Sequence, residues 1–293
     1  MSKLTLFHQS DFTGHKQSVY CVISDGEQGF FTAGSDGFIV QWSNPNENEG
    51  VVFARVPEAV FSLFYDQSND RILAGGQYGN VYILQKNQTP RIVKIHEGSV
   101  FWVGFGPIHY MSCSAKGDVV IWDSQGKIKK SIKLSFQPLR WGLKVDDHWW
   151  FTGSEGRIWE LNANLETRAS HNLGSHSWFK IAQIQDWVFA VGRDAKLHRW
   201  NRLFLDENIQ DAHWYSVHAL SISPDGKIIA TGSMDKSIRL WNVDTLQALG
   251  SIYSDNEHGH KSSVNDILWL DDSTLISVSD DASVRCWKLL SQA

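Results

Sequence analysis

The chain has 293 residues, of which 42% are hydrophobic and 20% charged, and its formal net charge is −5. This is ordinary globular composition, and the length suffices for a large core. The weakly negative balance excludes proteins that bind nucleic acid or an anionic membrane through a dense field of Lys and Arg. Because the sequence shows no signal-peptide-like apolar run and no stretch approaching a membrane span, we expect a cytoplasmic protein.

Three cysteines, Cys21, Cys113 and Cys286, are widely separated and have no C-x-x-C spacing. Each lies in an apolar segment typical of a strand, so we expect three buried thiols instead of a disulfide, a metal site or a catalytic group. Tryptophan is the unusual residue, with 14 copies, and its positions indicate how the chain is organised.

The first expected element is a strand at residues 3–9, KLTLFHQ, which precedes a repeat that runs to the C-terminus. Each repeat contains a tight turn and then an alternating strand that closes on a large apolar residue. In chain order the closing residues are Trp42, Leu84, Trp122, Leu161, Trp200, Trp241 and Trp287, spaced by 42, 38, 39, 39, 41 and 46 residues. The turn residues five positions earlier are Gly37, Gly79, Gly117, Gly156, Ala195, Lys236 and Ala282.

Between these positions apolar and polar residues alternate over short runs broken by Gly, Asp and Asn, and no segment has sustained helical periodicity. Four short strands per period of about 40 residues are the signature of a propeller blade, which buries both faces against its neighbours in a closed ring. We therefore predict an all-β protein, a seven-bladed β-propeller, with a single domain over residues 1–293.

A second motif leads several repeats. The segments GHKQSVYCV, AHWYSVHAL and GHKSSVNDI place His15, His213 and His260 four residues before an apolar residue. With these histidines, the acids in the tight turns and the closing tryptophans, the sequence resembles the WD40-repeat family over essentially the whole chain.

The resemblance implies a hydrogen-bonded relay within a complete blade, formed by a His, a Ser or Thr, an Asp and a Trp. The matching residues are His15, Thr32, Asp36 and Trp42 in the first repeat, His213, Thr231, Asp235 and Trp241 in the sixth, and His260, Ser277, Asp281 and Trp287 in the seventh.

Four repeats depart from that pattern. The third has Lys116 at the acid position and the fifth has Ala190 at the hydroxyl position. The second has Val56, Ala74, Tyr78 and Leu84, and the fourth keeps Glu155 but lacks the Trp and a clear His. We therefore expect the second and fourth blades to be held by packing alone.

Closure of the ring follows from the two ends of the chain. After Trp287 only KLLSQA remains, which completes a third strand and leaves no room for a fourth. The strand at residues 3–9 is then expected to supply the outer strand of the last blade, because this removes two open sheet edges.

Candidate chemistry is sparse. A Ser/Thr–His–Asp grouping suggests a catalytic triad, but its recurrence at one offset in several blades favours a structural role. His258 and His260 are two residues apart, yet His260 belongs to the relay and no third ligand is expected nearby. We therefore predict no catalytic residue, no metal and no cofactor.

The remaining candidates lie on the surface. In WD40-like propellers the partner usually binds the ring face formed by the linkers before the innermost strands and the turns after the second strands, here called the linker face. Its innermost rim is small and polar, so no deep aromatic cage is expected: Ser18, Ala59, Ser99, Pro138, Ser177, Ser216 and Ser263. Larger candidate partner-binding residues beside this rim are Lys16, Phe136, Arg193, Trp214, Tyr215, Met234 and Lys261.

Trp214 and Tyr215 are the sharpest candidates, because aromatic residues dominate binding hot spots. The alternative is that Trp214 folds back over its blade as packing. We predict a non-enzymatic scaffold, monomeric on its own, that binds a protein or peptide partner. The alternatives are an enzymatic propeller such as a lactonase or glycosidase, which needs carboxylates or metal ligands at the channel mouth, and a structural subunit that contacts its assembly through the blade edges.

Overall fold

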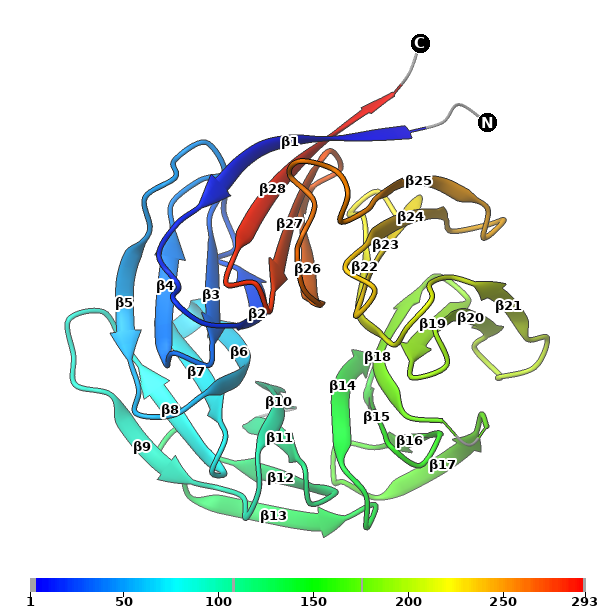
Figure 1. Ribbon diagram of the computed structural model, residues 1–293. Coiled ribbons are helices and arrows are strands. Elements are labelled where there is room, and N and C mark those ends of the chain that lie inside the picture. Colours follow the sequence, from blue (N-terminus) through cyan, green and yellow to red (C-terminus); the bar gives the residue numbers. More distant parts are fainter. Residues whose placement is uncertain (1–3, 107–108, 175, 292–293) are drawn as a thin grey trace.

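The computed structural model describes residues 4–106, 109–174 and 176–291. The chain forms seven four-stranded antiparallel sheets, arranged as blades around one axis (Figure 1). Within the described residues the only helical element is a short 3-10 turn, η1 (Gln67–Asn69). The predicted all-β, seven-bladed β-propeller is therefore confirmed. The ends of the predicted domain, residues 1–3 and 292–293, lie outside the described residues.

The first six blades each take four consecutive strands, ordered from the axis outward. They are β2 (Val19–Ser24), β3 (Phe30–Gly34), β4 (Phe38–Trp42) and β5 (Val51–Arg55); β6 (Val60–Asp66), β7 (Arg71–Gly76), β8 (Asn80–Leu84) and β9 (Arg91–Lys94); β10 (Val100–Phe105), β11 (Tyr110–Ser114), β12 (Asp118–Trp122) and β13 (Ile128–Lys133); β14 (Leu139–Val145), β15 (His148–Gly153), β16 (Arg157–Leu161) and β17 (Thr167–Asn172); β18 (Trp178–Ile184), β19 (Trp187–Gly192), β20 (Lys196–Asn201) and β21 (Asn208–Asp211); β22 (Val217–Ile222), β23 (Ile228–Ser233), β24 (Ile238–Asn242) and β25 (Ala248–Ile252).

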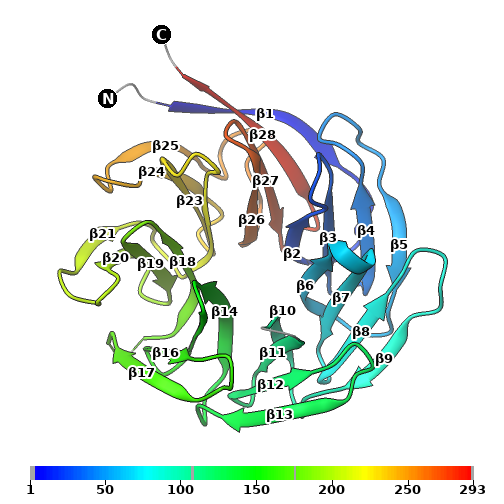
Figure 2. The ribbon, with the colours of Figure 1, turned by 180° about the vertical axis from the view of Figure 1, so that it is seen from behind.

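The seventh blade joins the two ends of the chain. Its inner strands are β26 (Val264–Asp271), β27 (Thr274–Ser279) and β28 (Val284–Ser291), and its outer strand is β1 (Leu4–Phe12). β1 runs antiparallel to β28, with Phe12 opposite Val284, and the two lie side by side in both views (Figures 1 and 2). This confirms the predicted closing strand, although residue 3 lies outside the described residues.

β1 extends beyond the predicted boundary at residue 9 because Phe12 has a packing role. Its side chain is 2% exposed, and its ring centroid lies 5.1 Å from those of Phe30 and Trp42 in the first blade. The closing strand therefore contacts both the seventh and the first blade.

The tight turn before each third strand has the same backbone conformation in all blades. The residues at this position have φ between 64° and 84°: Gly37, Gly79, Gly117, Gly156, Ala195, Lys236 and Ala282. Glycine adopts this left-handed conformation without strain, whereas Ala and Lys do so at a cost. At Ala195, Lys236 and Ala282 the geometry of the turn, which is the same in every blade, imposes a conformation that the residue itself does not favour.

The core is divided among the interfaces between blades. Each of the seven clusters of buried apolar side chains combines residues from two neighbouring blades. At the junction of the last and first blades, Ile276 and Val278 pack with Val22 and Val40. No blade buries both faces without its neighbours, which is the property that the sequence period predicted.

Cys21, Cys113 and Cys286 are buried free thiols. Among the described residues, none of the helices has the length and apolar character that a membrane crossing requires.

Candidate functional site

The sixth blade contains a continuous chain of hydrogen bonds from its centre to the linker face. Trp241 Nε1–H donates to Thr231 Oγ1 at 2.8 Å, and this hydroxyl lies 2.8 Å from His213 Nε2. His213 Nδ1 lies 3.1 Å from the Asp235 carboxylate. Because a carboxylate only accepts, Nδ1 carries the ring proton and Nε2 accepts from the hydroxyl.

The first and seventh blades have equivalent contacts. These join His15 with Thr32 and Asp36, Trp42 with Thr32, His260 with Ser277 and Asp281, and Trp287 with Ser277. In the seventh blade His260 Nδ1 lies nearer to Ser283 Oγ, at 2.9 Å, than to Asp281, at 3.4 Å.

Burial and hydrogen bonding set the charge states in these chains. Burial lowers the pKa of His213, despite the opposing effect of Asp235. Burial alone would raise the pKa of Asp235, but the hydrogen bonds from His213 and Ser237 outweigh it, so that this pKa is lowered. In the seventh blade the pKa values of His260 and Asp281 are both lowered, for the same reasons as in the sixth. Each pair therefore consists of a neutral imidazole and an ionised carboxylate at neutral pH.

The relay hydroxyls are inaccessible to a substrate, and the relay holds the backbone of the linker face in place. Thr32, Thr231 and Ser277 are completely buried, so none of these hydroxyls can reach a substrate. The aspartates also accept a backbone N–H from the residue after each histidine: Lys16, Trp214 and Lys261. The relay thereby anchors three of the candidate partner-binding residues by their backbone.

The third blade has the same relay with a displaced acid. Its histidine, His96, contacts the Asp118 carboxylate through Nδ1. His96 Nε2 lies 2.8 Å from Ser112 Oγ. Trp122 Nε1–H donates to Ser112 Oγ at 3.1 Å. The acid that was expected at Lys116 is therefore supplied two residues later, on the first residue of β12.

The prediction that the second and fourth blades are held by packing alone was wrong. In the second blade the buried Glu58 accepts hydrogen bonds from Tyr82 Oη at 2.6 Å and from Asn80 Nδ2 at 2.7 Å. In the fourth blade Ser135 Oγ donates to Glu155 at 2.6 Å. Glu58 also accepts a hydrogen bond from the backbone N–H of Tyr78, so a carboxylate joins the linker to the tight turn in both blades, although the residue types differ from the relay.

The fifth blade uses a histidine on its third strand. His198 lies 2.7 Å from Asp194 through Nε2 and 2.9 Å from Glu207 through Nδ1. His176, the histidine of the linker, is 3.6 Å from Asp194. The ring of His198 also stacks on Trp200. In other blades a Ser or Thr hydroxyl joins the His and the Trp, and in this blade, which has Ala190 instead, the contacts of His198 take that place.

The seven candidate partner-binding residues all lie exposed on loops of the linker face. Side-chain exposure is 89% for Phe136, 80% for Trp214, 61% for Tyr215 and 54% for Met234, and Lys16, Arg193 and Lys261 are also exposed. Within the sixth blade Met234 N–H donates to the Ser216 carbonyl at 2.9 Å. The loops carrying Trp214, Tyr215 and Met234 are therefore held side by side.

A central channel of about 790 Å³ runs inside the ring of innermost strands. At its mouth the second residue of every innermost strand points inward: Tyr20, Phe61, Phe101, Arg140, Phe179, His218 and Asn265. A register shift at this position in all seven blades turns these side chains into the channel.

These side chains contact one another around the channel. The ring centroids of Tyr20 and Phe61 are 5.2 Å apart, and those of Phe61 and Phe101 are 5.4 Å apart. The guanidinium of Arg140 follows, 4.4 Å from the Phe101 centroid and 5.6 Å from that of Phe179. The small polar rim predicted that no deep aromatic cage lies over the channel, but four aromatic side chains line it two residues beyond that rim: Tyr20, Phe61, Phe101 and Phe179.

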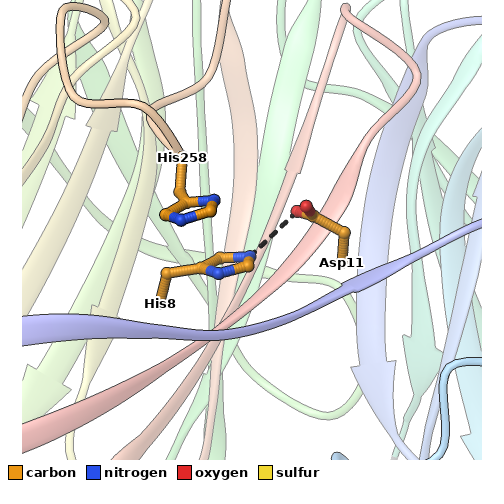
Figure 3. A group of neighbouring side chains, drawn as sticks. All are labelled: His8, Asp11 and His258. Carbon is orange, nitrogen blue, oxygen red and sulfur yellow. Dashed lines mark ion pairs between the residues drawn. The ribbon is translucent and has the colours of Figure 1, made fainter.

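The prediction that no third possible metal ligand lies near His258 was also wrong. His258 approaches His8 and Asp11 of β1, and one ligand atom of each lies within 4.8 Å of the others (Figure 3). The two imidazoles are stacked, with centroids 3.8 Å apart and planes 5° from parallel, so their in-plane lone pairs do not converge on one point. Asp11 Oδ1 also pairs with Arg285 Nε at 3.3 Å. The cluster is arranged as two stacked imidazoles, with the Asp11 carboxylate 3.1 Å from His8 Nε2, and not as a set of metal ligands.

Comparison with known proteins agrees with this geometry. The family model "WD domain, G-beta repeat" matches residues 7–43, 207–242 and 252–288, which contain the relays of the first, sixth and seventh blades. WD repeat-containing protein 1 of Xenopus tropicalis is 23% identical over 94% of this chain, and striatin of Rattus norvegicus is 24% identical over 80%. The chain spans only 47% and 29% of the lengths of these two relatives.

Among solved structures, the WD40 β-propeller domain of Doa1 superposes with a TM-score of 0.85, covers 97% of both chains and is 16% identical in sequence. The protein therefore belongs to the class of seven-bladed propellers. Three of its repeats match the WD40 family model, at the positions that the relay motifs of its sequence indicated.

Proposed function

We propose that the protein is a non-enzymatic interaction module, which holds a protein or peptide partner on its linker face in the cytoplasm and is monomeric by itself. The observation that carries this proposal is the placement of Trp214. Its side chain is 80% exposed, while its backbone N–H is fixed to the Asp235 carboxylate at 3.0 Å. A large aromatic group on a fixed backbone loses little conformational entropy on binding and is typical of hot spots. Such exposure does not fit the alternative in which Trp214 packs back over its blade.

The surroundings of Trp214 support a contiguous contact surface. Ser233 Oγ donates to the Tyr215 carbonyl at 3.0 Å, which joins the linker to the turn that carries Met234. Trp214, Tyr215 and Met234 thus project from one supported surface of the sixth blade, and Arg193 lies on the corresponding turn of the fifth. Lys16, Phe136 and Lys261 extend the proposed surface to the first, fourth and seventh blades.

The side chains at the channel mouth give less support to an enzymatic propeller. Asp266 forms an ion pair with Lys180, and Asp280 accepts a hydrogen bond from the Asn265 amide at 2.8 Å. Each carboxylate therefore has a partner within the protein, and the relay hydroxyls are buried. A lactonase or glycosidase requires acids that converge on a substrate.

A second candidate function has one observation in its favour. The outer strand β5 exposes Val51 at 63% and Val52 at 55%, two adjacent apolar side chains on an open sheet edge. Such an edge can pair with another chain, as a structural subunit of a larger assembly requires.

The test is affinity capture from the source organism's lysate with mass-spectrometric readout, using the wild type and a Trp214→Ala/Tyr215→Ala/Arg193→Ala variant that circular dichroism shows to be folded. The matched control is Leu203→Ala/Leu205→Ala, which removes exposed apolar side chains (73% and 59%) from a turn on the opposite face. We expect a partner that the control retains and the triple variant loses. A partner retained by the triple variant but lost on changing Val51 and Val52 to Thr would support the edge and contradict the linker face.

A further inference from the structure

Arg140 is a cation without a counter-ion in the lining of the central channel. Within the described residues it makes no ion pair, and its buried Nε has no hydrogen-bond partner. Its guanidinium is packed between the aromatic rings of Phe101 and Phe179. Burial lowers the pKa of Arg140, but an arginine remains protonated at neutral pH. A positive charge is therefore held in an apolar part of the channel.

The two carboxylates that line the channel have polar partners within the chain. Lys180 pairs with Asp266, and its ammonium also lies 4.4 Å from the ring centroid of Trp141. Asp280 makes no ion pair within the described residues and accepts a hydrogen bond from the Asn265 amide. Arg140 is half-buried, its Nε is buried without a partner, and no carboxylate of the described residues pairs with it, which indicates a site for an anionic group that comes from outside the chain.

The geometry of Arg140 selects the kind of anion. The guanidinium carbon lies over the rings of Phe101 and Phe179, and its buried Nε–H has no acceptor. The fork of N–H donors on a guanidinium matches a carboxylate, whose two oxygens accept parallel hydrogen bonds. The neighbouring walls are the rings of Tyr20, Phe61, Phe101 and Phe179, which favour a flat apolar body by stacking. The volume of about 790 Å³ is that of a small-molecule pocket.

We propose that the channel is a binding site for an aromatic carboxylate, with the carboxylate on the edge of Arg140 and the ring among Phe61, Phe101 and Phe179. A free small molecule and the C-terminus of a chain ending in an aromatic residue offer this same chemistry. The site lies inside the channel, whereas the proposed partner surface lies on the exposed loops, so each can fail without the other.

The test is isothermal titration of the full chain with 2-naphthoate and with 2-naphthamide, which has the same ring system and no charge. N-acetyl-Gly-Gly-Phe and its C-terminal amide form the peptide arm. We expect the carboxylate of at least one arm to bind at least about tenfold more tightly than its amide, because only the carboxylate forms the charged pair. The arm with the tighter carboxylate identifies the source of the ligand.

Variants locate the effect. Arg140→Met should weaken carboxylate binding by about tenfold or more and leave amide binding unchanged, while Arg91→Met, which removes an exposed arginine of the outer strand β9, should change neither. If Arg140→Met fails to fold, the difference in affinity between carboxylate and amide on the wild type still tests the proposal. Equal affinity for acid and amide, undiminished binding by Arg140→Met, or no binding of either carboxylate at millimolar concentration would overturn the proposal.

Discussion

At the scale of single residues, one buried hydroxyl joins two other side chains in each complete relay. Thr231 Oγ1 accepts from Trp241 and contacts His213 Nε2. Thr152 has the same place on the second strand of the fourth blade, but its hydroxyl donates only to the Arg157 carbonyl at 3.0 Å. Both side chains are completely buried. The two threonines therefore separate the contribution of the relay from that of a buried hydroxyl.

Replacing Thr231 by Val keeps the shape of the side chain but leaves the Trp241 N–H and His213 Nε2 without partners. We expect this change to lower the free energy of unfolding by about 1–3 kcal/mol, the cost of unsatisfied buried polar groups. Thr152→Val should cost about 1 kcal/mol or less. Urea denaturation of both variants measures the difference, and equal losses would show that the relay adds no stability.

The relay also makes stability depend on pH. Burial lowers the pKa of His213 and His260 in the folded state, whereas in the unfolded chain these residues take up protons near about pH 6.5. Below that pH the unfolded state binds more protons, so stability should fall as the pH decreases. The lowered pKa values of Asp235 and Asp281 act in the same direction, and their contribution is lost as the pH falls below about 4. Urea midpoints between pH 8 and pH 5, with NMR titration of the His213 ring, check this, and a His213 pKa at or above its usual value would contradict it.

At the scale of elements, ring closure depends on β1 and especially on its last residue. Phe12 lies between two blades, in contact with Phe30 and Trp42, whereas Phe7 on the same strand is 48% exposed. A strand that only completed the hydrogen bonds of β28 would not need a buried aromatic residue at its end.

Phe12→Ala should therefore lower the free energy of unfolding by about 3–5 kcal/mol, as is typical of a cavity in a packed core. Phe7→Ala removes a similar group from the same strand and should cost about 0.5 kcal/mol. Thermal or urea unfolding of the two variants measures this, and a Phe12 variant as stable as the Phe7 variant would mean that β1 closes the ring through its backbone alone.

At the scale of the whole molecule, the repeat was predictable because its signals are local. The turn residue, the alternating strand and the closing residue occupy adjacent positions, so seven blades and the closing strand follow from sequence periods. The acid of the third blade was missed because Asp118 lies two positions beyond the motif, and Glu58 because it lies two positions beyond Val56, in the linker. Both contacts form only when separate segments meet in the fold.

The aromatic ring of the channel was missed for a related reason. A bulge at the second residue of each innermost strand turns Tyr20 and its counterparts inward, and strict alternation from the rim does not show this. Reading one position in seven repeats together, as Tyr, Phe, Phe, Arg, Phe, His and Asn, would have identified the signal.

The central claim is that the linker face around Trp214 contacts a partner. The most direct measurement is site-specific photo-crosslinking, with a photoreactive phenylalanine analogue at position 214 and, in a second variant, at position 203 on the opposite face. We expect irradiation in the source lysate to produce a defined crosslinked species from position 214 and none from position 203, and free wild-type protein to compete for it. A crosslink from position 203 alone, or an identical species from both positions, would contradict the claim.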